Sequence, residues 1–556
     1  MWLRTASAIA CSRIASFRPP QPHSVAGHRH ASNPPARISP DGPGLAHFMQ
    51  SARKRPSKVV PTIEESHAYL SSQDYNGEGR KVMFLTYGCQ MNVSDTEVVR
   101  SLLMSNGYAE TAKMEEADII LLMTCSIREG AEEKVWRELR RIKDHSFRAR
   151  SVGVLGCMAE RVRHKLIEHS NLCDVVAGPD SYRDLPRLLA VARYGHKGMN
   201  VQLSLEETYA EVAPVRVDEE SKAAFVSIMR GCDNMCTYCI VPFTRGRERS
   251  RPIHSILEEV RRLSHQGVRQ VTLLGQNVNS YRDTSESTIP FTSQTGRVPG
   301  FSTVYSQRSG GRAFSTLLEE VSRIDPEMRI RFTSPHPKDF PLEVLQLIRD
   351  TPNICKQIHV PAQSGDDQVL SSMGRGYTRD AYLRLVDDIR SVLPDVSLTS
   401  DFIAGFCGES LSAHERTVSL IRLVQYSFCF VFPYSMREGT RANRRLEDSV
   451  PEEEKARRHT ELARVFREEA LKVNTALIGS RQLVLVEGDS KRSPSAGAGR
   501  TDGGTKVIFE KEGLSIIPGD YIISEITAAS SQTLQGRFIS HSSIKEFLSS
   551  SLQETS

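Results

Sequence analysis

Six short apolar stretches between Phe225 and Tyr434 alternate with segments of helical periodicity. This alternation predicts consecutive strand–helix units, and so parallel strands covered by helices. Six units fit an open, partial (β/α) barrel, whose active site would lie at the carboxyl ends of the strands. We expect strands near 225–230, 268–275, 328–333, 355–360, 396–403 and 428–434, linked by helices near 253–265, 314–323, 341–349, 378–392 and 411–424.

Three cysteines follow the first of these strands in the pattern C-x3-C-x2-C: Cys232, Cys236 and Cys239. Three thiolates on one short loop can hold three irons of a four-iron cluster and leave the fourth iron open for another ligand. A structural zinc site would need a fourth ligand from a second cysteine or histidine pair, and no such pair follows. Eleven cysteines in 556 residues do not suggest a disulfide framework. Besides the cluster, the remaining alternative is three idle thiols.

A second strand–helix region precedes this loop and predicts a parallel βαβ sheet. Its expected strands are 81–87, 118–124 and 151–155, with helices at 94–105 and 130–144. A cysteine follows each strand: Cys89, Cys125 and Cys157. Because parallel strands end at one rim of a sheet, the three thiols can converge there. The spacing alone leaves two alternatives open, a second metal site and the packing of small residues at tight turns.

The first 40 residues contain five arginines and no acidic residue. This composition is typical of a mitochondrial transit peptide, and the alternative is a disordered tail. The leader accounts for the whole net charge of +5, so the rest of the chain balances 67 basic against 67 acidic residues. Net charge therefore gives no argument for a nucleic-acid partner. No apolar run approaches 18 residues, so we expect no membrane span.

The C-terminal region begins with a charged segment, 451–477, that predicts a connecting helix. Expected strands at 482–487, 506–509, 521–526 and 533–539 are separated by glycine-rich turns, which favours a small all-β barrel. Such barrels often bind RNA, but eight basic and seven acidic residues lie between Thr475 and Lys545. Charge alone would make this barrel a packing module. The stretch 283–312, rich in Ser, Thr and Gly, is expected to be a mobile surface insertion.

Several sequence motifs together resemble the radical S-adenosylmethionine (SAM) methylthiotransferase family. They are Thr86-Tyr87-Gly88-Cys89-Gln90-Met91-Asn92, Thr124-Cys125-Ser126, Gly156-Cys157-Met158-Ala159-Glu160, the Cys232 loop, Phe243-Thr244-Arg245-Gly246-Arg247-Glu248-Arg249-Ser250-Arg251, Thr333-Ser334-Pro335-His336-Pro337 and Leu274-Gly275-Gln276-Asn277-Val278-Asn279-Ser280-Tyr281. The motifs at 86–92 and 274–281 look like those of the branch that acts on tRNA carrying an isopentenyl group on the adenosine beside the anticodon. Cys407 departs from the proline found in many relatives, but it is not an expected ligand.

The resemblance implies an α/β protein with three folded parts. We expect a transit peptide at 1–40 and a disordered linker at 41–79. An N-terminal methylthiotransferase domain with an open parallel βα sheet would occupy 80–205. A radical SAM core with a partial (β/α)6 barrel would occupy 218–471, and a small all-β TRAM barrel 475–546.

The resemblance also implies the chemistry. Cys232, Cys236 and Cys239 would hold one 4Fe-4S cluster and, through it, bind SAM. Cys89, Cys125 and Cys157 would hold a second 4Fe-4S cluster. No catalytic residue is expected beyond these ligands. The implied function is the addition of a 2-methylthio group to N6-isopentenyladenosine in mitochondrial tRNA, by a radical mechanism.

The implied partners are the anticodon loop of mitochondrial tRNA, an electron donor of the ferredoxin or flavodoxin type, and a kinase regulatory subunit. The implied location is the mitochondrial matrix, and an additional cytosolic pool stays open. The family's TRAM domain docks tRNA, and segment 499–503 of this chain resembles a motif of that domain. Two other functions stay open: a non-catalytic interaction protein of a kinase activator, and a methylthiotransferase acting on a protein side chain.

Two further groups of residues have alternative interpretations. Arg245, Arg247, Arg249 and Arg251 alternate along the chain. They would either face cofactor carboxylate or RNA phosphate, or form a solvated face paired with Glu248. Gly275, Gln276, His359, Gln363 and Asp401 lie at expected strand ends. They would line a cofactor pocket or serve the fold.

Overall fold

The computed structural model describes residues 70–126, 129–144, 151–168, 172–285, 300–301, 311–511 and 513–554. The expected transit peptide and linker residues 41–69 lie outside the described residues, as does most of the insertion at 283–312. Residues 70–79, at the end of the expected linker, include the short 3-10 helix η2 (Ser72–Tyr75). None of the described helices combines the length and hydropathy that crossing a membrane requires.

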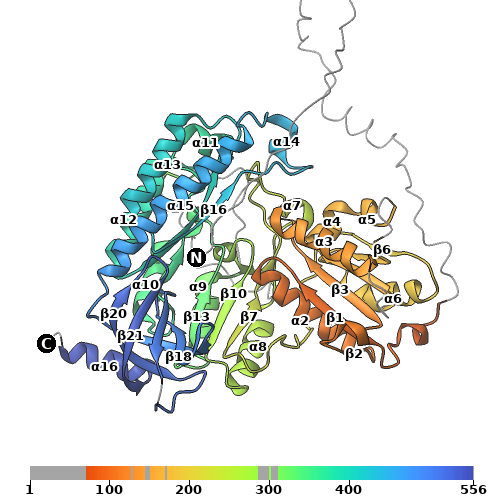
Figure 1. The fold of residues 1–556 in the computed structure, drawn as a ribbon, viewed down its shortest axis with the longest axis horizontal. Coiled ribbons are helices and arrows are strands. Elements are labelled where there is room, and N and C mark those ends of the chain that lie inside the picture. Colours follow the sequence, from red (N-terminus) through yellow and green to blue (C-terminus); the bar gives the residue numbers. More distant parts are fainter. Residues whose placement is uncertain are drawn as a thin grey trace, which may run out of the picture. The chain divides into compact units, whose positions relative to one another are not determined.

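The N-terminal domain is built on a six-stranded parallel sheet in the order β2-β1-β3-β4-β5-β6 (Figure 1). The strands are β1 (Lys81–Thr86), β2 (Ala109–Glu110), β3 (Ile119–Thr124), β4 (Ser151–Gly156), β5 (Val175–Ala177) and β6 (Gly198–Asn200). The helices are α2 (Gln90–Met104), α3 (Glu129–Asp144), α4 (Cys157–Val162), α5 (His164–Glu168) and α6 (Leu185–Arg193).

Two hydrophobic clusters cover the two faces of this sheet. Side chains of α2 and α6 pack on one face, and those of α3, α4 and α5 pack on the other. Strand β3 lies between both layers and all six of its residues are buried. Its continuous apolar sequence, IILLMT, is what a central parallel strand requires, because water reaches neither side of it.

The core domain has six parallel strands in chain order, arranged as two three-stranded sheets. They are β7 (Ala223–Ser227), β10 (Gln270–Leu274), β13 (Arg329–Phe332), β14 (Gln357–His359), β15 (Ser397–Ala404) and β16 (Phe428–Pro433). A single bridge between Ile330 and Ile354 links the two sheets. The predicted fold class, an α/β protein with an open parallel sheet, a partial barrel and a small β-barrel, is confirmed.

Helices cover the strands of the core domain and link them, much as the periodicity predicts. They are α8 (Ile253–His265), α9 (Phe314–Ser322), α10 (Leu342–Asp350), α12 (Arg379–Val392) and α13 (Leu411–Val424). A further short helix, α11 (Asp367–Ser372), was not expected. Smaller elements complete the domain: β8 (Met229–Arg230), α7 (Val241–Thr244), β9 (Arg249–Ser250), β11 (Arg282–Asp283), β12 (Arg312–Ala313) and α14 (Arg441–Arg445).

The C-terminal part begins with helix α15 (Glu452–Thr475), followed by a closed barrel in the order β17-β18-β19-β21-β20. Its strands are β17 (Arg481–Ser490), β18 (Ser493–Arg500), β19 (Lys506–Glu510), β20 (Tyr521–Ala529) and β21 (Thr533–Ser542), and helix α16 (Ile544–Glu554) follows. We did not expect β18, because its sequence SPSAGAGR has no β-branched or aromatic residue. Its pairing with β17 and β19 holds it in a strand.

The barrel packs against the amino ends of the core strands. Arg329, at the start of β13, donates hydrogen bonds to the carbonyl oxygens of Leu483 and Arg500. Arg331 donates to those of Thr501 and Asp502. Segment 499–503 therefore contributes backbone carbonyl acceptors to the contact between the barrel and the core domain. The cysteine loop follows β7 and β8, so it lies toward the opposite, carboxyl ends of the strands.

Candidate metal centres

The first three cysteines, here called the strand-end trio (Cys89, Cys125, Cys157), stand directly after three adjacent strands. Cys89 caps α2 after β1, Cys125 follows β3, and Cys157 begins α4 after β4. The Cys125 thiol hydrogen-bonds to Cys89. Cys125 and Cys157 are buried, and Cys89 is partly exposed. The sheet thus brings together the three side chains that the sequence placed at strand ends.

The close approach of these segments depends on Gly88. Its φ of +112° lies where side chains are disfavoured. A Cβ there would lie 2.5 Å from Cβ of Cys125 and 3.4 Å from its Sγ. A glycine is therefore needed at the turn that presents Cys89.

The thiols of this trio differ in acidity. The hydrogen bond from Cys125 lowers the pKa of Cys89 to about 6, with help from the positive charge of Arg245 and against the effect of burial. Burial raises the pKa of Cys157, and the charge of Arg245 opposes this. Because the thiolate is the form that binds metal, Cys89 is ready to ligate near neutral pH.

Arg245 connects this trio to the core domain. Its Nε donates a hydrogen bond to Sγ of Cys157 at 3.1 Å, and its Nη2 donates to Oδ2 of Asp95 at 2.7 Å. Its Nη1 is buried and has no hydrogen-bond partner within the described residues. An unsatisfied buried donor costs about 1–3 kcal/mol, so an acceptor on a bound group would be stabilising at this position.

The arginines of segment 245–251 form neither one row that faces a ligand nor one solvated face paired with Glu248. Arg245, Arg249 and Arg251 are buried and pair with Asp95, Asp180 and Glu259. Arg247 is half-exposed and pairs with Asp233. The segment is not one extended strand, because α7 ends at Thr244, Gly246 has φ +69° and β9 begins only at Arg249. The side chains therefore point to different partners instead of forming one row.

The second set, here called the loop trio (Cys232, Cys236, Cys239), lies between β8 and α7. Cys232 and Cys236 are buried, and Cys239 is partly exposed. The backbone N–H of Asn234 donates to Sγ of Cys232 at 3.4 Å. Burial raises the pKa of Cys239 to about 12. Burial also raises the pKa of Cys232 well above its usual value.

Arg375 stands beside the loop trio as Arg245 stands beside the strand-end trio. Its Nη1 donates to Sγ of Cys236 at 3.4 Å, and its other groups bind the hydroxyl of Tyr377 and the carbonyl of Pro361. Arg375 is 6% exposed, and no carboxylate in the described part of the chain pairs with it. A buried cation without a counter-ion is costly, so an anionic group held by the three thiolates would offset its charge.

The donor set of each trio is three thiols, which is a donor set that iron–sulfur clusters use. Among the described residues, no three histidine, cysteine, aspartate or glutamate side chains are close enough together to hold one metal ion. In a four-iron cluster each thiolate binds a different iron, so the ligands surround the cluster without meeting at one point. The two trios therefore fit the donor set of iron–sulfur clusters. Helices α4 and α7, which adjoin the two trios, are in contact.

The five further candidates at strand ends divide into two groups. Gly275 serves packing, since a Cβ there would lie 2.5 Å from Cγ of Met229. Gln363 pairs through its backbone with β15 at a φ of +68°. Gln276 keeps a buried Oε1 without a hydrogen-bond partner in the described structure. His359 contacts Asp401, with 3.3 Å between Nε2 and Oδ2. Gln276, His359 and Asp401 stay candidates for binding a ligand.

Sequence reasoning missed Arg375 and the role of Asp95. Neither belongs to a recognised metal-ligand spacing, and both act through contacts between distant segments. The one available signal for Arg375 was its position between two glycines, Gly374 and Gly376, in an expected connection. Such a signal marks a turn but does not indicate what the side chain contacts.

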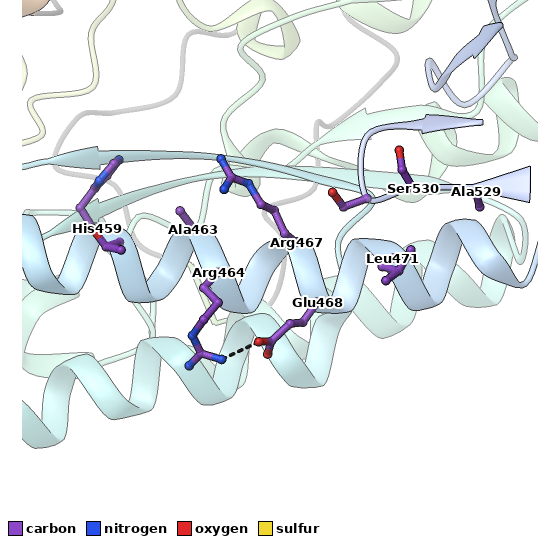
Figure 2. A pocket seen from close by; sticks show the side chains of 10 residues that line it. His459, Ala463, Arg464, Arg467, Glu468, Leu471, Ala529 and Ser530 are labelled. Atoms are coloured by element: carbon purple, nitrogen blue, oxygen red, sulfur yellow. Dashed lines mark hydrogen bonds and ion pairs between the residues drawn. The ribbon is translucent and has the colours of Figure 1, made fainter. Parts of the chain in front are cut away.

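A surface groove of about 680 Å³ lies between α15 and the turn that joins β20 to β21, and none of the six cysteines lines it. Figure 2 shows His459 and Arg467 on one side of α15, while Arg464 and its partner Glu468 point away from them. Ser530 adds a hydroxyl group to the rim. Because Glu468 pairs with Arg464, the positive charge that the groove offers a phosphate comes from Arg467.

Each of the three folded parts of the chain matches a known protein family. Three family models match it: uncharacterized protein family UPF0004 over 81–178, the radical SAM superfamily over 226–421, and the TRAM domain over 476–539. A CDK5RAP1-like protein of Caenorhabditis elegans is 60% identical and covers 98% of this chain and 99% of its own. The mitochondrial tRNA methylthiotransferase CDK5RAP1 of Mus musculus is 55% identical, covering 91% of this chain and 89% of its own.

A bacterial relative extends the comparison. The tRNA-2-methylthio-N(6)-dimethylallyladenosine synthase of Chloroherpeton thalassium is 44% identical, over 85% of this chain and 99% of its own. Relatives of such identity and coverage share the whole domain arrangement, not one domain alone. The chain belongs to the tRNA methylthiotransferase family of radical SAM proteins.

Proposed function

We propose that this protein adds a 2-methylthio group to N6-isopentenyladenosine beside the anticodon of mitochondrial tRNAs. The observation that carries the proposal is the pair of cysteine trios, each with a buried arginine on one sulfur. The names of the relatives support tRNA as the substrate and the mitochondrion as the location. They favour this function over a protein substrate and over a non-catalytic kinase partner.

The six cysteines would divide the chemistry between them. Cys232, Cys236 and Cys239 would hold a 4Fe-4S cluster that also binds SAM, and Cys89, Cys125 and Cys157 would hold a second one. When bound, these groups would supply the radical and the sulfur that an unactivated adenine carbon requires. Reduction of the cluster that binds SAM would require a low-potential electron donor of the ferredoxin or flavodoxin type.

The protein's own contribution is to keep the two trios together and away from water. The N-terminal domain provides Asp95 and Asp180, and the core domain provides their arginine partners. Breaking a buried pair of this kind by removing one partner costs about 3–5 kcal/mol. These ion pairs therefore resist separation of the domains. Four of the six thiols, all but those of Cys89 and Cys239, are buried away from solvent.

The groove beside α15 is our candidate for contact with the tRNA backbone. Arg467 is exposed on α15 and lines the groove together with His459 and Ser530, whereas Arg464 pairs with Glu468. Phosphate contacts of this type position an RNA without reading its sequence. Arg467→Ala should weaken tRNA binding and reduce its salt dependence, whereas Glu468→Ala should not weaken it.

The test of the function is an anaerobic assay of the reconstituted protein on an isopentenylated anticodon stem-loop. Mass spectrometry should find the methylthio group on the adenosine that carries the isopentenyl group. A stem-loop without the isopentenyl group is the matched control and should react far less. Recovery of unmodified stem-loop from a protein with both trios loaded would reject tRNA as the substrate.

A further inference from the structure

Arg245 belongs to the core domain but contacts a cysteine of the N-terminal domain. Its Nε lies 3.1 Å from Sγ of Cys157. Its Nη2 binds Asp95 at 2.7 Å and reaches Oδ1 of Asn92 at 3.4 Å, and both residues lie on α2 directly after Cys89. The guanidinium group of Arg245 therefore contacts Cys157 itself and the helix that follows Cys89. Its own side chain is 3% exposed.

The charges around Arg245 do not balance. Asp95 pairs with both Arg245 and Arg230, and Asp180 pairs with both Arg230 and Arg249. Three buried guanidinium groups therefore share two carboxylates, which leaves one positive charge in excess. Because Asp95 also pairs with Arg230, its carboxylate keeps one arginine partner when Arg245 is absent. An anion beside Arg245 would complete the balance, and the guanidinium group contacts the sulfur of Cys157, which a bound cluster would make anionic.

Arg249 shows what a purely structural arginine looks like in the same segment. It is as buried as Arg245, at 4% side-chain exposure, and it also crosses the domain boundary to an aspartate. Its other hydrogen bonds go to backbone carbonyls, and it donates none to sulfur. Arg245 differs in its bond to Cys157 and in the buried Nη1 that has no partner among the described residues.

We infer that Arg245 is a positioning residue of the strand-end cluster, supplied by the neighbouring domain. It fixes the Cys157 sulfur by a charge-assisted hydrogen bond, and its positive charge makes the cluster there easier to reduce. The strand-end site is thus incomplete without the core domain. This inference rests on the proposed function only in taking the strand-end trio to hold a cluster.

The test uses the full chain with Cys232, Cys236 and Cys239 changed to alanine, so that only the strand-end trio can hold iron. The midpoint potential of its cluster is measured by electron paramagnetic resonance during a redox titration. Arg245→Gln in this background should make reduction at least about tenfold less favourable, which is 59 mV for a one-electron couple. Arg249→Gln, the matched control, should leave the potential in place. Equal potentials in the parent and Arg245→Gln would overturn the inference.

A second measurement needs no folded Arg245→Gln variant. With arginine labelled by nitrogen-15, pulsed resonance on the same parent should detect a nitrogen coupled to the cluster spin, and this coupling should be absent from Arg245→Lys. Arg245→Lys keeps the charge, so the midpoint potential of its cluster should stay close to that of the parent. No nitrogen coupling in the parent would overturn the inference. Failure of the parent to bind iron would instead reject the two-cluster part of the proposed function, and the inference with it.

Discussion

The two cysteine trios offer the same ligands but are built in different ways. The loop trio comes from one short segment, whereas the strand-end trio is assembled from the ends of β1, β3 and β4. Each has one buried arginine on a sulfur, Arg375 or Arg245. Only Arg245 is also paired with a carboxylate. The loop trio therefore depends on local backbone geometry, and the strand-end trio depends on sheet pairing and on a second domain.

The thiols of the two trios also differ in acidity before metal binds. A hydrogen bond lowers the pKa of Cys89 to about 6, while burial raises that of Cys239 to about 12. A thiol must lose its proton to become a ligand. Cys89 can thus ligate with a thiolate already formed, whereas metal binding must displace the proton of Cys239.

The largest expected effect comes from removing one trio at a time. Alanine at all three positions of either trio should lower the iron content by about four per chain. The loop variant should lose both SAM cleavage and tRNA thiolation, because it lacks the SAM site. The strand-end variant should still cleave SAM and should lose only thiolation. Cleavage products and modified tRNA are both measured by mass spectrometry, and loss of SAM cleavage in both variants would contradict the division of roles.

A single added methyl group should also distinguish the trios. Gly88→Ala places a Cβ against Cys125, and Gly231→Ala places one against the carbonyl of Arg247. Each should lower iron binding at its own trio, measured as iron per chain in the background that lacks the other trio. Gly479→Ala is the control, because φ there is also positive, at +87°, but a Cβ would meet nothing within 4 Å. Equal iron loss in all three would attribute the effect to backbone strain alone.

The two arginines should respond differently in the metal-free protein. Arg245→Gln removes one of the two arginine partners of the buried Asp95 carboxylate. Because Arg230 stays, the variant should cost about 1–3 kcal/mol of stability, less than a fully broken buried pair. Arg375→Gln removes a buried cation that has no carboxylate partner in the described structure, so it should cost less. Thermal unfolding of the apoproteins measures this difference. After iron is loaded, the difference between the two stability losses should become smaller, because the bound cluster then offsets the charge of Arg375. A larger stability loss for Arg375→Gln than for Arg245→Gln in the apoprotein would contradict the charge argument.

The smallest effect concerns Glu160 on α4, the helix that Cys157 begins. Burial raises the pKa of Glu160 to about 7. A carboxyl whose pKa is higher in the folded than in the unfolded state loses stability as the pH rises from about 4.5 through about 7. Glu160→Gln should remove this loss and stabilise the protein at pH 8 by an amount on the order of 2 kcal/mol, with little change at pH 5. Melting temperatures at the two pH values test it, and an equal shift at both would exclude ionisation as the cause.

The sequence alone predicted those parts of the fold and of the candidate sites that depend on a local pattern of residues. The cysteine spacing, the six strand–helix units and the strand-end position of Cys89, Cys125 and Cys157 are all local features. The destinations of Arg245 and Arg249 were not predictable, because they depend on how two domains pack. Strand β18 was missed because pairing with its neighbours, and not its own composition, makes it a strand. The word 499–503 contributes acceptors to Arg329 and Arg331, which charge counting cannot show.

The most direct test of the central claim is an iron count on the anaerobically reconstituted full chain. Two separate trios that each hold a four-iron cluster predict about eight irons per chain. Either triple-alanine variant should then hold about four. About four irons in the unmodified chain, all lost when Cys232, Cys236 and Cys239 are changed to alanine, would contradict the two-site account.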